Sequence, residues 1–266
     1  MPTSLLAAFA IADYLVATIV LALPIARQTA PTRGIGLGLA TLAVLVHASL
    51  IFGMHRGGLD LHFFASLSLA GFGVAALTLL VNLFRPVAAL GVIVFPLAAL
   101  LLGIDVFVAA PTLAEPMEWQ IKLHVTFALL AYSLLSIAAL LAILLSLQER
   151  ALRRHQLDSN LIRALPPLTL TESLLFRLIA AGFVFLTLTL VSGVLFVDNL
   201  FAQHLAHKTI LSIASWFVFG ILLFGRWRWG WRGNRAVRLT LIGMIVLLLA
   251  FFGSKFVLEM VLKRAM

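Results

Sequence analysis

Apolar stretches of about 20 residues recur along the whole chain, and most of the charges lie in the short connections between them. A helix of that length crosses the roughly 30 Å hydrocarbon core of a bilayer. Because no water is available there, each backbone N–H and C=O must be paired within the chain, as an α-helix does. Only 11% of the residues are charged, against about 25% in a soluble domain. The sequence predicts an all-α, polytopic membrane helix bundle with a single integral-membrane domain, residues 1–266.

The connections between the apolar stretches define eight spans and their direction. We expect spans over residues 4–25, 34–54, 62–83, 87–109, 120–147, 172–197, 205–224 and 237–262. The odd-numbered connections hold most of the arginines, whereas the even-numbered ones are poor in basic residues and hold Asp60, Glu115, Glu118 and Asp198. The positive-inside rule therefore places the odd connections in the cytosol and both termini outside, in a multi-pass protein of the bacterial inner membrane. The first span lacks a basic n-region and is expected to be retained.

The net charge of +9 does not indicate nucleic-acid binding, because the basic residues separate apolar stretches and do not form one polar face. The segment Gly225–Gly233, GRWRWGWRG, alternates Trp with Arg. Tryptophan and arginine at the cytosolic end of a span are typical of membrane proteins, where both contact lipid headgroups. We therefore expect the lipid bilayer as a partner and no nucleic acid. Cysteine is absent, which excludes disulfides and thiolate metal sites.

The stretch from Glu115 to Arg150 contains the longest predicted helix, residues 120–147, roughly 42 Å at about 1.5 Å per residue. It exceeds the hydrocarbon core, so it must tilt or continue into the cytosol. His124 lies near its outer end. The connection 148–171 that follows is basic and is expected to be a helix extension and a surface linker.

The histidines are concentrated on the outer side of the predicted topology. His55, His62, His124, His204 and His207 lie in or beside the external connections. Neutral imidazole is a common metal ligand, and haem iron takes one or two histidines axially. His204 and His207 are three residues apart and share one face of a helix. We take His124 and His207 as the best candidate iron ligands, with His204 as a further haem contact.

Each histidine also has an ordinary structural explanation. His55 and His62 are most simply solvated loop residues, and His47 is more typical of a hydrogen-bonded core residue than of a ligand. Nearby cations favour haem, because Lys122, Lys208 and Lys255 are all external and the two haem propionates pair with cations. Lys208 is therefore a candidate cofactor-binding residue. Lys255 is also four residues before Glu259, so an intrahelical ion pair competes for it.

Four segments carry a resemblance to a known family: LHVTFALLAYSLLSIAALLAILLSLQER (Leu123–Arg150), LPPLTLTESLLFRLIAAGFVFLTLTLVSG (Leu165–Gly193), HKTILSIASWFVFGILLFGRWRWGWRG (His207–Gly233) and FFGSKFVLE (Phe251–Glu259). Together they resemble the cytochrome c assembly proteins of the CcsA/HemX type, and within them the YpjD-like inner-membrane branch. The resemblance covers roughly the last 150 residues well and the first 100 mainly by the number of spans.

The resemblance implies a haem-handling membrane protein associated with cytochrome c assembly, with other assembly or membrane proteins as partners. His124 stands where the family has a histidine opening a helix of the form HVxxxLLAY. Asp198–Trp216 occupies the place of the family's external tryptophan-rich haem loop, but here it reads DNLFAQHLAHKTILSIASW. The candidate ligand role of His207 therefore depends on its position in the chain alone, because it does not match a ligand residue of the family.

Two other functions are consistent with the residues. Asp13, Asp105 and Lys255 are ionisable groups within spans, which is typical of a small-solute or ion transporter. The 148–171 connection, with Arg153 and Arg154, is a candidate contact surface of a non-catalytic regulatory partner. No nucleophile–base pair or carboxylate dyad is evident, so we expect a binding protein and not an enzyme.

Overall fold

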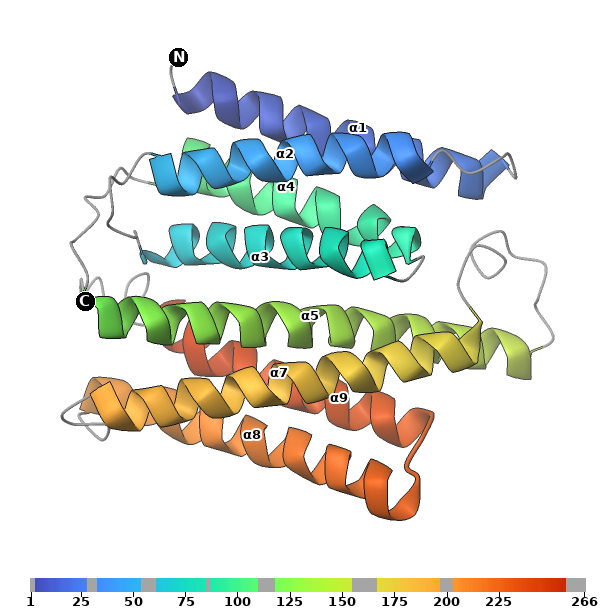
Figure 1. The fold of residues 1–266 in the computed structure, drawn as a ribbon, viewed down its shortest axis with the longest axis vertical. Helices are drawn as coiled ribbons and strands as arrows, with labels where there is room; N and C mark the ends of the chain where they lie inside the picture. The colour runs from blue at the N-terminus through green and yellow to red at the C-terminus, as the bar shows by residue number, and fades with distance from the viewer. Residues whose placement is uncertain are drawn as a thin grey trace. The chain divides into compact units, whose positions relative to one another are not determined.

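The protein is almost entirely helical within the described residues of the computed structural model, which are 3–27, 33–53, 61–84, 87–109, 118–154, 167–196 and 203–256 (Figure 1). Its elements are α1 (Thr3–Arg27), α2 (Arg33–Gly53), α3 (Phe63–Phe84), η1 (Ala88–Leu90), α4 (Gly91–Phe107), α5 (Trp119–Arg153), α7 (Leu168–Phe196), α8 (Gln203–Trp229), α9 (Asn234–Leu248), η2 (Leu249–Gly253) and α10 (Ser254–Phe256). Within these residues, eight helices are long and apolar enough to cross a membrane. The predictions of an all-α bundle and of eight spans are confirmed.

The helices differ from the predicted spans mainly at the cytosolic ends. Helix α5 has 35 residues and continues to Arg153, which makes it about 52 Å long. Helix α8 continues through Trp229, so the first five of the nine residues in the Gly225–Gly233 segment are helical. The last span changes from α-helix to π-helix at Leu249. Residues 155–166, the middle of the predicted partner-contact connection, and residues 257–262 of the predicted last span lie outside the described residues.

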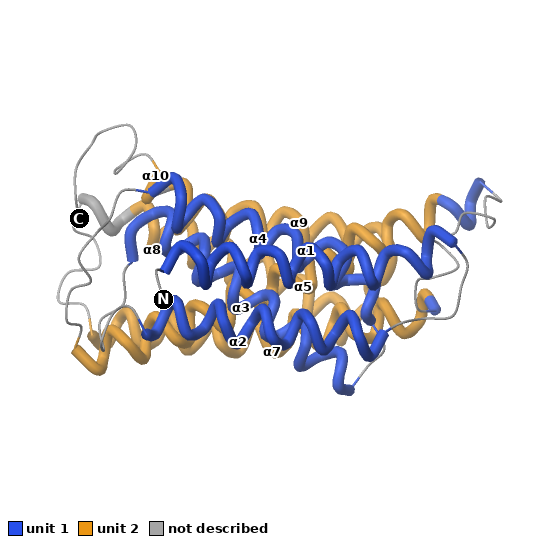
Figure 2. Tube along the Cα trace, turned by 90° about the horizontal axis from the view of Figure 1, so that it is seen from above, with its two compact units in different colours: residues 1–117, 151–167 blue, residues 118–150, 168–266 orange. Residues whose placement is uncertain are grey.

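The helices fall into two compact units, which are coloured separately in Figure 2. Unit 1 comprises residues 1–117 and 151–167, and unit 2 comprises residues 118–150 and 168–266. Each unit is described by itself below. The prediction of a single membrane domain over residues 1–266 stays a prediction.

Unit 1 is a four-helix bundle in which α1 packs on α2 and α4, and α3 packs on α2 and α4. Small residues allow the close approach. Gly36 of α2 faces Leu21 of α1, and a Cβ built there would lie 2.6 Å from the leucine. Ala7 and Ala10 belong to a buried cluster with Leu50 and Leu102. Helices in lipid associate through this kind of tight van der Waals packing, because burying apolar groups away from lipid gains little.

Unit 2 contains α5, α7, α8 and α9, which are joined by contacts of the same kind. Gly182 of α7 faces Leu135 of α5, and Gly243 of α9 faces Phe219 of α8. Polar side chains add bonds between helices: the Trp216 indole N–H donates to Thr187 Oγ1 at 2.8 Å, and the indole stacks on Phe183. Such bonds fix the register of neighbouring helices, since an unpaired polar group in hydrocarbon costs free energy.

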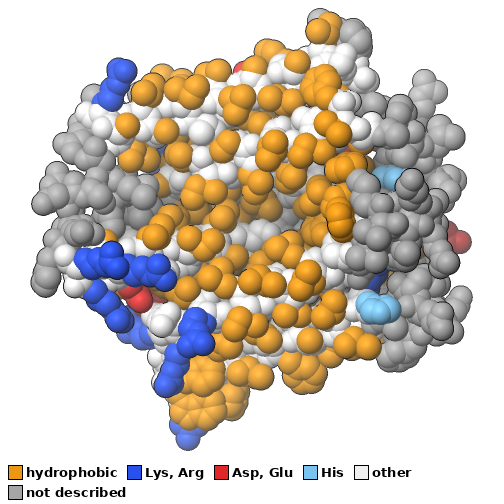
Figure 3. Space-filling model, turned by 180° about the vertical axis from the view of Figure 1, so that it is seen from behind, with side chains coloured by type: hydrophobic (Ala, Val, Ile, Leu, Met, Phe, Trp, Pro, Cys, Tyr) orange, Lys and Arg blue, Asp and Glu red, His pale blue; other side chains and the backbone are white. Residues whose placement is uncertain are grey.

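Large hydrophobic side chains also cover much of the protein's surface, as expected where a helix faces lipid. On the face drawn in Figure 3, Lys and Arg side chains gather at one end of a broad hydrophobic surface. In unit 2, the end with the α8–α9 connection carries Arg226, Arg228, Arg232 and Arg235. The positive-inside rule places this end in the cytosol.

The close contact at Gly182 gives a testable prediction. Gly182→Val should destabilise unit 2 by about 1–3 kcal/mol, because overpacking forces Leu135 from its position. Thermal unfolding in detergent, followed by circular dichroism, measures the change. Gly38→Val is the matched control, since a Cβ at Gly38 meets nothing within 4 Å. Equal losses for both variants would show that the contact at Gly182 does not limit packing.

Candidate functional site

His124 lies in the second turn of α5, half-buried against the last turns of α7. Its Nδ1 is 2.9 Å from Ser192 Oγ. The next residue of α7 is Gly193, and a Cβ built there would lie 3.4 Å from His124 Cε1. The serine thus binds one nitrogen of the imidazole, and the backbone at Gly193 lies beside the ring. Trp119 and Phe196 also meet, with ring centroids 5.9 Å apart, and hold these two helix ends together.

The hydrogen bonds around His124 determine which ring nitrogen carries the proton. Ser192 Oγ donates its only proton to the Thr189 carbonyl at 3.0 Å. Toward His124 it must therefore act as an acceptor. This contact requires a proton on Nδ1, so the neutral ring has its lone pair on Nε2. Among the described residues, nothing hydrogen-bonds to Nε2. A histidine held in this way is ready to bind a metal ion through Nε2.

Two lysines gather around Phe251 in the same unit. The Lys255 ammonium lies 5.4 Å from the Phe251 ring centroid, and the Lys208 ammonium lies 5.9 Å from it. Lys255 is buried and Lys208 is half-buried. These two residues come from α10 and α8, so the fold brings together cations that are 47 positions apart in the chain. Two partly desolvated ammonium groups form a favourable site for a dianionic group.

The Phe251 ring is tied to α5 through Tyr132, which lies eight residues, or about 12 Å along the helix, from His124. The Tyr132 ring lies 6.1 Å from Phe251 and 5.9 Å from Phe252, and its hydroxyl donates to the Leu247 carbonyl at 2.7 Å. Leu247 lies just before the π-helical turn, where the change of hydrogen-bond register disturbs the pairing of carbonyls. Single π-helical turns are frequent at functional sites.

The predicted site residues are only partly brought together. His124 contacts α7, and Lys208 contacts the π-helical turn; both are in unit 2. His207 is exposed in the second turn of α8. No described contact joins His207 to His124. His204 belongs to α8, but its side chain lies outside the described residues.

His47, in unit 1, has the core role that the sequence favoured. It is fully buried, with Nδ1 3.3 Å from the Tyr14 hydroxyl and Nε2 3.1 Å from Ser68 Oγ. Its ring also meets the edge of Phe72. Since both nitrogens have protein partners, His47 has no free lone pair for a metal ion. It links α1, α2 and α3.

The donor set in the described part of the chain suits a haem iron better than a bare metal ion. Within that part, no group of three or more His, Cys, Asp or Glu side chains is close enough to hold a metal ion. Structural zinc needs four such ligands. Haem iron needs only one or two from the protein. One oriented imidazole with cations in the same unit meets that smaller requirement.

Ser192 and Thr189, which determine the ring nitrogen of His124 that carries the proton, were not predicted from the sequence. Ser192 and Gly193 are small residues in an apolar span, and such residues are common at helix contacts. Nothing in the linear pattern indicates that they face a histidine 68 positions earlier.

Comparison with known proteins gives consistent matches. The family described as Cytochrome C assembly protein matches residues 35–262. The inner membrane protein YpjD of Escherichia coli K12 is 38% identical over 138 residues, which is 52% of each chain. The cytochrome c biogenesis protein CcsA of Prochlorococcus marinus is 23% identical over 255 residues, 82% of this chain and 79% of that protein. The alignment thus spans about half the length of the YpjD relative. No solved structure matches this chain.

The core role of His47 is testable. His47→Ala should destabilise the protein by about 1–3 kcal/mol, because it leaves the buried hydroxyls of Tyr14 and Ser68 without a partner. The midpoint of thermal unfolding in detergent measures the loss. His62→Ala, an exposed histidine of the same unit, is the matched control. A midpoint unchanged in His47→Ala would contradict a core role.

Proposed function

This chain belongs to the cytochrome c assembly protein family, and on that basis we propose that it binds haem near the external face of the membrane, in support of cytochrome c assembly. The single observation that supports the proposal most is the state of His124. Its proton is held on Nδ1 by Ser192 Oγ, whose own proton goes to the Thr189 carbonyl, and this leaves the Nε2 lone pair for iron. In metal sites, a ligating histidine almost always donates its other N–H to such an acceptor.

The residues of unit 2 fit haem in two further respects. Lys208 and Lys255 offer two ammonium groups beside Phe251, and haem carries two propionates. The rings of Phe251, Phe252 and Tyr132 offer an apolar surface beside these cations. When bound, haem would supply a redox-active iron whose properties the axial ligand sets. The chain itself would orient the imidazole, pair the propionates and exclude water.

His207 is the proposed second axial ligand, and His204 a neighbouring contact. Three features support His207: it is exposed, it lies on the first turns of α8, and it directly precedes Lys208. The family's tryptophan-rich pattern is replaced in this segment. We therefore propose haem binding without catalysis, and we do not assign transfer of haem to a cytochrome.

The proposed location is the bacterial inner membrane. YpjD, to which this chain is similar, is named an inner membrane protein, and this chain has eight membrane-type helices within its described residues. The external side follows from the distribution of arginines. Other membrane proteins of cytochrome c assembly are the proposed partners.

Haem binding is tested on the full chain, purified in detergent and titrated with ferric haem. The wild type should give a saturable Soret band with the spectrum of histidine-ligated iron. His124→Ala should weaken binding at least tenfold, since it removes the oriented ligand, and His207→Ala should change the spectrum by removing the second ligand. A tenfold change corresponds to about 1.4 kcal/mol.

His62→Ala is the matched control for a histidine lost from the external side, because His62 lies in the other unit. Its titration should equal that of the wild type. A wild type without a Soret band, or equal weakening in His62→Ala and His124→Ala, would refute the proposed site.

Transport of a small solute or ion is a second candidate, favoured by Asp13. Its Oδ2 is enclosed and has no hydrogen-bond partner in the described structure. Asp13 lies on α1, which packs on α4, the helix that contains Asp105. A carboxyl oxygen enclosed in a membrane bundle is costly unless a proton or a cation compensates it. Lys255, the third residue considered for transport, belongs to unit 2.

A transport function would make activity depend on Asp13 and not on His124. In proteoliposomes with an imposed proton gradient and a pH-sensitive dye inside, Asp13→Asn should abolish proton-coupled flux, while His124→Ala should leave it intact. Asp105→Asn tests the neighbouring carboxyl. Flux that is absent from the wild type, or that is unchanged in Asp13→Asn, would rule out this candidate and leave haem binding unaffected.

A further inference from the structure

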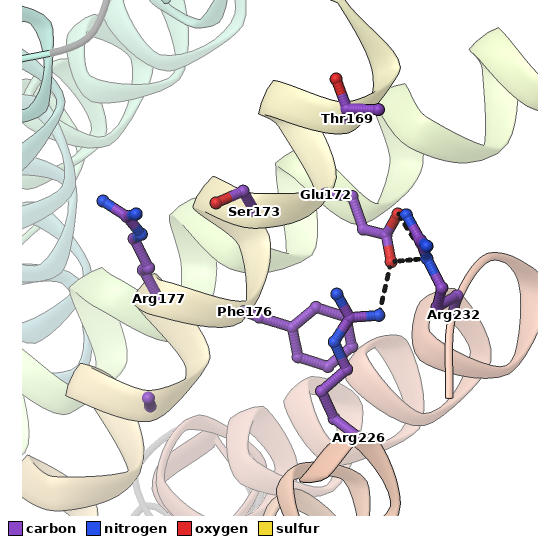
Figure 4. A pocket seen from close by; sticks show the side chains of 8 residues that line it. Thr169, Glu172, Ser173, Phe176, Arg177, Arg226 and Arg232 are labelled. Carbon is purple, nitrogen blue, oxygen red and sulfur yellow. Dashed lines mark hydrogen bonds and ion pairs between the residues drawn. The ribbon is translucent and has the colours of Figure 1, made fainter. Parts of the chain in front are cut away.

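A second site lies at the opposite end of unit 2 from His124. An open pocket of about 330 Å³ is lined by Thr169, Glu172, Ser173, Phe176, Arg177, Ala180, Arg226 and Arg232. The first six come from the first turns of α7, and the two other arginines come from the end of α8 and the turn that follows it (Figure 4). None of these residues takes part in the proposed haem site.

The floor of the pocket is a buried carboxylate that is fully bonded by arginines. Glu172 is only 3% exposed. Arg226 Nη1 donates to its Oε1 at 2.9 Å, and Arg232 donates from Nε and Nη2 in a forked contact at 2.8–3.1 Å. Figure 4 shows both guanidinium groups converging on this one carboxylate. Glu172 therefore fixes where the two arginines lie.

The pocket keeps a surplus of positive charge. Three arginines face one glutamate, which leaves a formal charge of +2 among the lining residues. The hydrogen bonds that Arg232 donates to Glu172, and then the negative charge of Glu172, raise the pKa of Arg232, so this guanidinium stays protonated at every physiological pH. A guanidinium has five N–H donors, and the contacts with Glu172 use only some of them. The remaining donors match the oxygens of a second anion.

Arg177 is the third positively charged residue that lines the pocket. It is exposed on α7, one turn after Ser173, and within the described residues it has no ion-pair or hydrogen-bond partner. In Figure 4 its side chain extends from α7 on the side away from Arg226 and Arg232, and no dashed line reaches it. The exposed hydroxyls of Thr169 and Ser173 lie on the same stripe of α7. Thr169 belongs to the first turn, where the helix end is positive.

The position in the membrane restricts which anions can reach the pocket. The exposed Trp227 and Trp229 lie at the same end of α8, and tryptophan prefers the level of the lipid headgroups. The lining stripe of α7 runs from Thr169 to Ala180, from hydroxyl and charged groups to apolar ones. The arginines place this end on the cytosolic side. Phosphate groups are the most abundant anions there, in lipid headgroups and in soluble phosphate esters.

We infer that this pocket binds a phosphate group at the cytosolic surface of the membrane, held by the remaining donors of Arg226 and Arg232, which Glu172 positions, with Arg177 as a further cation at the edge of the pocket. Arginine suits this role because its planar fork matches phosphate oxygens. The phosphate comes from the headgroup of an anionic phospholipid or from a soluble phosphate ester.

The test compares Arg177→Gln with Arg228→Gln in the full chain. Both variants remove one exposed arginine from the same end of unit 2, but only Arg177 lines the pocket. Native mass spectrometry in detergent measures the retention of added phosphatidylglycerol, with the zwitterionic phosphatidylcholine as reference. The wild type should retain phosphatidylglycerol selectively, Arg177→Gln should bind it roughly fivefold more weakly, and Arg228→Gln should equal the wild type.

A second arm separates the two sources of phosphate. Thermal unfolding with and without inorganic phosphate tests a soluble ligand: stabilisation that depends on Arg177, without selective lipid retention, supports the phosphate site and assigns it to a soluble ester. Equal weakening by Arg177→Gln and Arg228→Gln would indicate diffuse surface attraction and overturn the inference. So would an Arg177→Gln variant that matches the wild type with both probes.

Discussion

The absence of water from the bilayer core is the constraint on which this structure depends. Helices satisfy their own backbones, so the polar side chains within the spans must find partners on neighbouring helices or at helix ends. Trp216 meets Thr187, and Tyr132 meets the Leu247 carbonyl, each at less than 3 Å. Glycine and alanine supply the close contacts that make such bonds reachable. For the same reason, a polar atom without a partner suggests a binding role, because it does not stabilise the fold.

Hydrogen-bond partners distinguish two histidines that look alike in the sequence. Both lie on apolar helices in the outer half of a predicted span. His47 has protein partners at both ring nitrogens and is a structural link. His124 has its acceptor, Ser192 Oγ, at Nδ1, and Nε2 has no partner in the described structure. The difference arises from the helix opposite: Ser192 already donates to Thr189, so it can only accept from the imidazole.

Much of the fold follows from the sequence, because eight apolar stretches separated by charged connections leave few alternatives. The helical class, the number of spans and the long helix that contains His124 were all predictable in this way. The helix ends were less predictable: α8 continues through Trp229, into a segment that the sequence identified only by its alternating Trp and Arg. The π-helical turn at Leu249 has no signal in the apolar pattern, since both helix types bury the same residues.

The sites were predictable only in part. Histidine and lysine are rare in apolar spans, and this rarity pointed to His124 and Lys208. Their partners are common residues whose meaning depends on contacts across the bundle, such as Ser192 for His124 and Phe251 for Lys208. Glu172 also had no distinguishing feature in the sequence. Its ion pairs with Arg226 and Arg232 are what mark the pocket as a candidate binding site.

The central claim is that His124 offers Nε2 to a haem iron. The low-temperature electron paramagnetic resonance spectrum of the full chain with ferric haem tests it most directly, because the spin state of the iron reports its axial ligands. The wild type should give a low-spin signal typical of imidazole ligation, and His124→Ala should lose it and show high-spin iron. A spectrum that is the same in both proteins would contradict it.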